Sequence, residues 1–195
     1  MHTKKLIGVL QSFVVFPMFA MTMPLASLNA VGSVTANTDL LASEVSVITT
    51  QEDESRQAKA DAIDDYFASK GAPLSGYGMK FVEEAEENDI DWRLLPAIAM
   101  RETTGGKFAC KSAKAPNNNF GWHSCKSGFS SVEASIEYIS KTLGGNNDNV
   151  LHYHSEMTTE QILKKYNPDS IIPGYSKQVM KIMDSIEVFR KDNTA

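Results

Sequence analysis

Apolar residues recur at helical spacing along most of the chain after residue 55, and this pattern favours a fold built mainly from helices. Ile63, Tyr66 and Phe67 form one apolar stripe on an acidic segment that ends before Gly71. A similar stripe, which includes Met183, lies near the C-terminus. Together, the spacing and the boundary residues predict helices over residues 56–70, 78–88, 91–102, 130–143, 158–166 and from 175 onward.

Three of these helix starts have residues typical of N-caps. Asp91 precedes the apolar helix over residues 91–102 and is expected to be its N-cap. Ser130 and Glu133 have the spacing of a capping box, and so do Thr158 and Gln161. The caps and the periodicity therefore predict the same helices independently.

One loop-rich segment, over residues 103–129, interrupts the helical pattern. The chain has 195 residues, of which 42% are hydrophobic and 22% charged, as in ordinary globular proteins. This size is enough for one domain with extensions. We therefore expect a mainly α domain over residues 56–192, in which the helices surround one irregular lobe.

The N-terminal residues have the pattern of an export signal. Lys4 and Lys5 precede an apolar stretch, which small residues follow up to Ala30. We interpret residues 1–30 as a signal peptide; the alternative is an uncleaved membrane tether through residues 6–28. Residues 31–55 are rich in Ser, Thr, Ala and Val and are expected to be a flexible linker. Either interpretation places the domain outside the cytoplasm, as a secreted, cell-surface or periplasmic protein.

Export also affects the interpretation of the two cysteines, Cys110 and Cys125. Disulfides persist in oxidising compartments, so we expect a bridge between them, with two free thiols as the alternative. Two cysteines exclude a four-cysteine zinc site, and His152 and His154 lack an apparent third ligand, so no metal is expected. The formal net charge of −5 argues against a general nucleic-acid partner.

Charge is distributed unevenly along the chain. Residues 52–91 are strongly acidic, whereas residues 103–132 contain Lys107, Lys111, Lys114 and Lys126 and no Asp or Glu. This basic lobe is either a face for an anionic ligand or a solvated loop whose lysines favour solubility.

The candidate for catalytic chemistry is Glu102, which ends an apolar helix and is followed by Thr103, Thr104 and two glycines. The negative end of the helix dipole disfavours a carboxylate at this position. A carboxyl group that keeps its proton near neutral pH is what general-acid cleavage of a glycoside requires. The alternative is a surface glutamate paired with Arg101 or with a lysine.

Five segments occur in an ordered set, and together they resemble a known family. In the sequence, residues 73–78 read PLSGYG, residues 117–122 NNNFGW and residues 128–136 GFSSVEASI, and residues 88–106 carry Glu102. With KYNP at residues 165–168, they are similar to the glucosaminidase domain of glycoside hydrolase family 73, of the lysozyme-like superfamily. The resemblance implies a lysozyme-like helical fold with a small irregular or β lobe beside a cleft. It also implies hydrolysis of the β-1,4 bond that follows N-acetylglucosamine in peptidoglycan strands, with no cofactor.

The same resemblance implies roles for particular residues. Glu102 corresponds to the general acid of the family, and Tyr166 to a late tyrosine in the cleft. Trp122 either stacks on a sugar ring or belongs to the core of the lobe. The residues expected to contact substrate are Thr104, Asn118, Asn119, Phe120 and Trp122.

The sequence departs from some relatives in one respect, which leaves two other functions open. There is no acidic residue between Thr103 and Val132, so the lobe supplies no second carboxylate. A lytic transglycosylase, which needs a single acid and forms a 1,6-anhydro sugar, is therefore an alternative to hydrolysis. A cell-wall glycan-binding module without turnover is the other.

Overall fold

The computed structural model describes residues 36–192, with side chains described for residues 49–191. Within these residues it is mainly helical and contains no strand. The expected irregular lobe is present over the described residues 104–131, and it lacks the β structure that the family resemblance allowed.

The signal or tether expected in residues 1–30 lies outside the described residues, and none of the described helices is long and apolar enough to cross a membrane. The helices are α1 (Ala36–Ser69), α2 (Gly78–Glu87), α3 (Leu94–Thr103), the 3-10 helix η1 (Trp122–Cys125), α4 (Val132–Leu143), α5 (Thr159–Tyr166) and α6 (Tyr175–Asp192).

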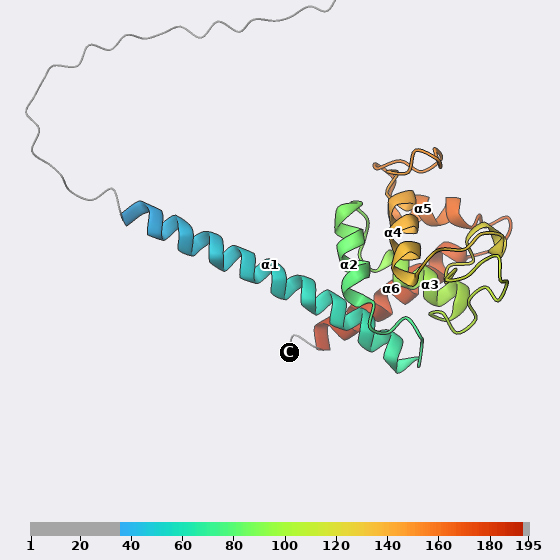
Figure 1. The fold of residues 1–195 in the computed structure, drawn as a ribbon, viewed down its shortest axis with the longest axis horizontal. Coiled ribbons are helices and arrows are strands. Elements are labelled where there is room, and N and C mark those ends of the chain that lie inside the picture. Colours follow the sequence, from blue (N-terminus) through green and yellow to red (C-terminus); the bar gives the residue numbers. More distant parts are fainter. Residues whose placement is uncertain (1–35, 193–195) are drawn as a thin grey trace, which may run out of the picture.

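Helix α1 begins much earlier than the sequence pattern indicated. It starts at Ala36, so the flexible linker expected over residues 31–55 is wrong from residue 36 onward. No glycine or proline occurs within α1, and a helix that is nucleated by packing extends at little cost through such residues. The C-terminal half of α1 packs on α2 and α6, whereas its N-terminal half projects from the body (Figure 1). Residues 49–55 are accordingly exposed.

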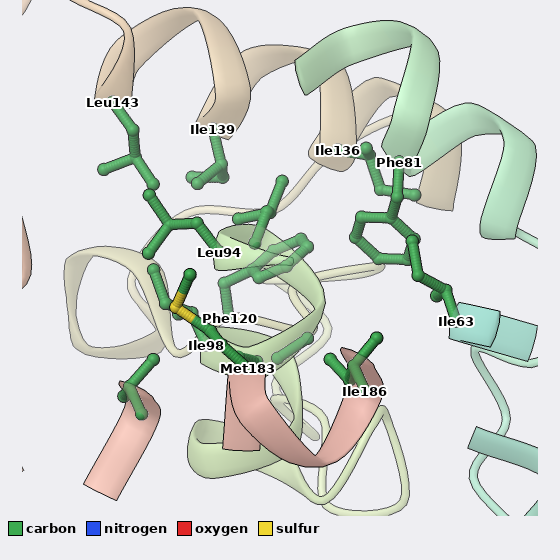
Figure 2. Packing of buried hydrophobic residues seen from close by; sticks show 14 of the residues in the cluster. Ile63, Phe81, Leu94, Ile98, Phe120, Ile136, Ile139, Leu143, Met183 and Ile186 are labelled. Carbon is green, nitrogen blue, oxygen red and sulfur yellow. The ribbon is translucent and has the colours of Figure 1, made fainter. Parts of the chain in front are cut away.

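Helix α3 lies at the centre of the hydrophobic core. Leu94, Ala97, Ile98 and Ala99 are completely buried, as expected for a helix that is apolar on all sides. Figure 2 shows side chains of α1, α2, α4 and α6 converging around it. Because α3 is enclosed in this way, its C-terminal end is held in a fixed position, and Glu102 lies in that last turn.

The helix caps confirm one prediction and correct another. Thr158 and Gln161 form the expected capping box at the start of α5. At the start of α4, however, the cap is Ser131, whose hydroxyl accepts from the amide of Ala134 at 3.1 Å, so the capping box assigned to Ser130 is wrong. Ser130 and Ser131 carry the same hydroxyl group, and the backbone places Ser131 at the cap position.

Asp91 also has a different role from the one expected. Helix α3 begins three residues later, at Leu94, and has no side-chain cap. The Asp91 carboxylate instead accepts from the backbone amide of Arg93 at 2.9 Å and pairs with its guanidinium at 2.6 Å. Arg93 also lies 3.6 Å from Glu187 on α6. These three charged groups therefore link the start of α3 to α6.

The lobe over residues 104–131 is held by a disulfide and by turns. The expected bridge between Cys110 and Cys125 is confirmed, with the two Cα atoms 5.5 Å apart. The backbone amide of Cys110 donates to the carbonyl oxygen of Asn118, which ties the two sides of the lobe together. The lobe is thus a fixed structure beside the end of α3.

Candidate active site

The site is built around Glu102 at the end of α3. The helix ends one residue later, at Thr103, because Thr104 adopts the left-handed conformation with φ 54° and ψ 49°. Thr103 fastens this end to the lobe, since its hydroxyl lies 2.6 Å from the backbone oxygen of Asn119. The Glu102 side chain is half-buried and faces a cleft between the lobe, α5 and the loop that follows α4.

Tyr175, the first residue of α6, orients the Glu102 carboxyl group. Its hydroxyl donates to Glu102 Oε1 at 2.6 Å, and its side chain is completely buried. The sequence interpretation missed Tyr175 as a site residue. The available signal was its position one helical turn before Val179 on a core-facing stripe, because a buried tyrosine hydroxyl usually has a hydrogen-bond partner.

Tyr166 is the second tyrosine of the site. Its ring stacks on that of Tyr175, with centroids 6.2 Å apart and an angle of 9° between the planes. Its hydroxyl donates to the backbone oxygen of Phe120 at 2.7 Å. Burial, followed by the nearby Glu102, raises the pKa of Tyr166 and of Tyr175 well above the ordinary tyrosine value. Both hydroxyls therefore remain neutral donors at any physiological pH.

The cleft that Glu102 faces has a volume of about 530 Å³. Among the described residues that line it, Glu102 is the single carboxylate. We call this hollow the Glu102 cleft. It is lined by Glu102, Phe120, Gly121, Trp122, His123, Ser124, Val150, His152, Tyr153, Lys165, Tyr166, Asn167, Pro168 and Ile171.

Gly121 leaves space for the second carboxyl oxygen. It has a φ of +63°, and a Cβ atom at this position would lie 3.3 Å from Glu102 Oε2. Oε1 is engaged by Tyr175, so Oε2 is the oxygen that borders the backbone of the lobe. A proton on Oε2 would lie at the wall formed by Gly121.

The residues expected to contact substrate divide into two groups. Phe120 and Trp122 line the Glu102 cleft, whereas Thr104, Asn118 and Asn119 are not part of its lining. Thr104 is the C-cap of α3, and the backbone oxygen of Asn119 lies 2.6 Å from the Thr103 hydroxyl.

Asn118 serves as an internal support of the lobe. Its side chain is completely buried, and its amide nitrogen donates to the backbone oxygens of Trp122 and Ser127 at 2.9 and 2.8 Å. Its amide oxygen accepts from the backbone amides of Phe120 and Trp122 at 3.3 and 2.9 Å. All four bonds are made within the lobe, so the side chain shapes the wall of the cleft from behind.

Trp122 combines the two roles considered for it. The residue is only 9% exposed, and its ring packs 5.9 Å from that of Tyr166 and 6.2 Å from that of Tyr138, between centroids. His123 stacks on it at 5.3 Å and is itself exposed at the cleft. Trp122 is therefore part of the core of the lobe and also forms part of the cleft wall.

Within the described residues, no group of three or more His, Cys, Asp or Glu side chains is placed to hold a metal ion. Comparisons of the chain with known protein families, with curated proteins and with solved structures found no match. The features that bear on function are therefore the chemistry of the Glu102 cleft and the sequence motifs that surround it.

Proposed function

We propose that the protein is an exported peptidoglycan hydrolase that cleaves the β-1,4 bond after N-acetylglucosamine, within a lysozyme-like fold. The observation that carries the proposal is the Glu102 carboxyl group at the cleft, with Oε1 bound by the Tyr175 hydroxyl at 2.6 Å. An oriented carboxyl group at the end of a buried helix suits a general acid. The family resemblance of the surrounding motifs, and the export signal expected in residues 1–30, support the choice of substrate.

In the proposed reaction, Glu102 transfers its proton to the glycosidic oxygen as the bond from that oxygen to the anomeric carbon breaks. The positive charge that develops on the sugar is stabilised by the carbonyl oxygen of its own N-acetyl group or by Tyr166. Water then adds to the anomeric carbon and gives a proton to the Glu102 carboxylate, which restores the acid and leaves a reducing N-acetylglucosamine end. The single carboxylate in the lining of the Glu102 cleft supports a scheme with one acid.

Substitution of Glu102 by Gln tests the proposal, because it removes the acid with little change of shape. Digestion of purified peptidoglycan, followed by mass analysis, should give reducing N-acetylglucosamine ends with the wild-type protein. We expect the rate to fall by a factor of at least about 100 in Glu102→Gln, in line with the loss of a general acid. Equal release by both proteins would exclude Glu102 as the acid. Glycan binding without any release would favour the binding module.

The lining of the Glu102 cleft also supports a second candidate, a lytic transglycosylase. No second carboxylate is available among the described lining residues to activate water. In a transglycosylase, Glu102 protonates the glycosidic oxygen as its bond to the anomeric carbon of N-acetylmuramic acid breaks. The 6-hydroxyl group of that sugar then attacks the same anomeric carbon and returns its proton to Glu102. The same mass analysis separates the two reactions, because an anhydro end is lighter than a reducing end by one water molecule.

A further inference from the structure

Three successive residues beside the Glu102 cleft have an unusual backbone conformation. His123, Ser124 and Cys125 have φ values of 50°, 53° and 59°, in the left-handed region that non-glycine residues rarely adopt. Residues in this conformation persist only where the surrounding structure holds them. Because His123 and Ser124 line the cleft, whatever holds these residues also holds part of the cleft wall. We call residues 122–126 the wall segment.

The wall segment is tied to the rest of the lobe by hydrogen bonds at its two ends and by the disulfide between them. At its start, the Asn118 side chain accepts from the backbone amide of Trp122 and donates to the backbone oxygen of Trp122, both at 2.9 Å. Just beyond its end, the same side chain donates to the backbone oxygen of Ser127 at 2.8 Å. Between these points, the disulfide joins Cys125 to Cys110. The covalent tie thus acts directly on the left-handed part of the segment.

Cys110, the other half of the bridge, follows a part of the lobe that is anchored at the end of α3. Two residues before it, the backbone amide of Phe108 donates to the carbonyl oxygen of Thr103 at 2.9 Å. Thr103 directly follows Glu102 in the sequence. The disulfide therefore connects the wall segment to the helix end that carries the proposed acid.

The disulfide is not enclosed in the core. Cys110 and Cys125 are both half-buried, so part of each residue is exposed to solvent. Over residues 104–131 the lobe contains no strand and no α-helix, so no regular ladder of backbone hydrogen bonds would keep the wall segment in place without the bridge. His123 and Ser124 are exposed and have room to leave the left-handed region.

From these observations we propose that the disulfide is a redox switch of the Glu102 cleft. In the oxidised protein, the bond between Cys110 and Cys125 keeps the wall segment in its left-handed form, and the wall of the cleft is complete. After reduction the left-handed residues relax, His123 separates from Trp122, and the wall opens. The switch rests on the proposed function, because it regulates turnover at Glu102 and adds a condition under which turnover occurs.

The reductant of this switch is a dithiol. One of its sulfurs, as a thiolate, attacks Cys125 Sγ, forms a mixed disulfide and displaces the Cys110 sulfur as a thiolate. The second sulfur of the reductant then displaces the Cys125 sulfur, and the reductant leaves as a disulfide. Two electrons pass to the cysteine pair, and the two protons of the dithiol end on the cysteine thiols. An oxidising disulfide reverses the exchange, so export to an oxidising compartment would activate the protein.

The experiment compares the oxidised protein with protein reduced by dithiothreitol, on purified peptidoglycan. We expect reduction to lower the rate of fragment release by about 10- to 100-fold, as for displaced groups near a reacting bond, and reoxidation to restore it. Far-ultraviolet circular dichroism should not change, because both cysteines lie outside the α-helices. The double variant Cys110→Ser, Cys125→Ser should have the low rate with or without dithiothreitol.

Two results of this comparison would overturn the proposal. One is an equal rate in the oxidised and reduced proteins. The other is a loss of rate that accompanies a loss of helix, because the disulfide would then support the whole fold and would not act on the wall segment.

A further variant tests the left-handed backbone itself. Glycine adopts a positive φ without a steric penalty, so Ser124→Gly should retain more of its rate after reduction than the wild type does. Ser130→Gly is the matched control, because Ser130 is another exposed serine of the lobe and does not have a positive φ. If both variants lose as much rate as the wild type, relaxation of these residues does not open the wall, and the inference fails.

The fluorescence of Trp122 gives a readout that does not depend on catalysis. The chain has two tryptophans, so Trp92→Phe leaves Trp122 as the remaining one. Trp122 is nearly buried and stacks on His123 at 5.3 Å, so reduction should shift its emission to longer wavelength.

This readout separates failure of the switch from failure of the proposed function. A reversible shift of the Trp122 emission, with no product released in either state, would overturn the catalytic proposal and keep the switch. Product release whose rate does not respond to reduction, together with an unchanged emission, would keep the catalytic proposal and overturn the switch.

Discussion

At the scale of single residues, the hydrogen bond from Tyr175 to Glu102 is the feature most directly connected with catalysis. Tyr175→Phe removes the hydroxyl and retains the ring that stacks on Tyr166. As Glu102 gives up its proton in the proposed reaction it becomes a carboxylate, and a hydrogen bond to a charged group contributes about 1.5–3 kcal/mol. We therefore expect kcat to fall about 10- to 100-fold with little change in KM, because the acid loses its orientation while the cleft is preserved.

Steady-state kinetics on soluble glycan fragments would measure this change, with thermal unfolding as a check on the fold. Tyr77→Phe is a suitable control, because Tyr77 packs against the core away from the Glu102 cleft. An unchanged kcat in Tyr175→Phe would show that the hydrogen bond does not position the acid.

Gly121 allows a prediction that separates backbone strain from obstruction of the acid. In Gly121→Ala, the methyl group lies 3.3 Å from Glu102 Oε2, at a backbone φ of +63°. The left-handed conformation costs a non-glycine residue about 1–2 kcal/mol, so unfolding should occur at a lower temperature. Activity should also fall, because the new methyl group crowds Oε2, the carboxyl oxygen that is not bound by Tyr175.

The matched control for Gly121→Ala is Gly76→Ala. Gly76 has a φ of +96°, and a Cβ atom there would have no neighbour within 4 Å. Both variants should therefore lose stability, but only Gly121→Ala should lose activity per folded molecule. Equal specific activity in the two variants would argue against a role for the space beside Oε2.

At the scale of elements, the contact between the start of α3 and α6 makes stability depend on pH. Burial would raise the pKa of Asp91, but its hydrogen bonds with Arg93 outweigh this and lower it. Glu187 on α6 also has a lowered pKa, chiefly through its hydrogen bond with Arg190. A lowered folded-state pKa contributes stability that is present above the unfolded pKa and is lost as the pH falls through the folded one.

We therefore expect the free energy of unfolding to decrease as the pH falls below about 4, where carboxyl groups of the unfolded chain begin to bind protons. Asp91→Asn should be less stable than the wild type at neutral pH, and the difference should shrink in acid. Denaturant unfolding at a series of pH values would measure both effects. A constant difference between the two proteins across this range would contradict the assignment.

The elements also show which parts of the fold could be predicted from the sequence. The capping box at Thr158 and Gln161 is confirmed because its partners are three residues apart, within one turn. The Asp91 cap is wrong because a turn precedes α3, which starts only at Leu94, so the Asp91 carboxylate binds Arg93 in that turn instead of capping the helix. Local patterns predict where helices form, and neighbouring side chains decide the residue at which each begins.

The candidate site was less predictable than the helices for a related reason. Glu102 and Tyr175 are 73 residues apart in the sequence, so their hydrogen bond follows only from the packing of α6 on α3. Asn118 belongs to a recognisable segment, yet the segment does not reveal that its amide faces inward. The residue types in the sequence therefore predicted which groups could take part in the chemistry. The direction in which each side chain points depends on the fold and could not be predicted.

At the scale of the whole molecule, α1 has two parts that should contribute differently to stability. The part that packs on α2 and α6 carries Ile63 and Phe67, both completely buried. The part before residue 56 projects from the body, and its residues 49–55 are exposed. An exposed helical segment gains little from tertiary packing, which is the main source of helix stability in proteins.

A protein that begins at Glu52 should therefore unfold within a few degrees of one that begins at Ala36, and should release the same products from peptidoglycan. A protein that begins at Phe67 lacks Ile63, and loss of a buried isoleucine alone costs about 2–5 kcal/mol, so we expect it to unfold at a much lower temperature. Calorimetry of the three proteins would measure the difference.

A large loss of stability in the protein that begins at Glu52 would mean that the projecting half of α1 packs against another surface, such as a second copy of the chain. Concentration dependence of the unfolding temperature would identify that second copy.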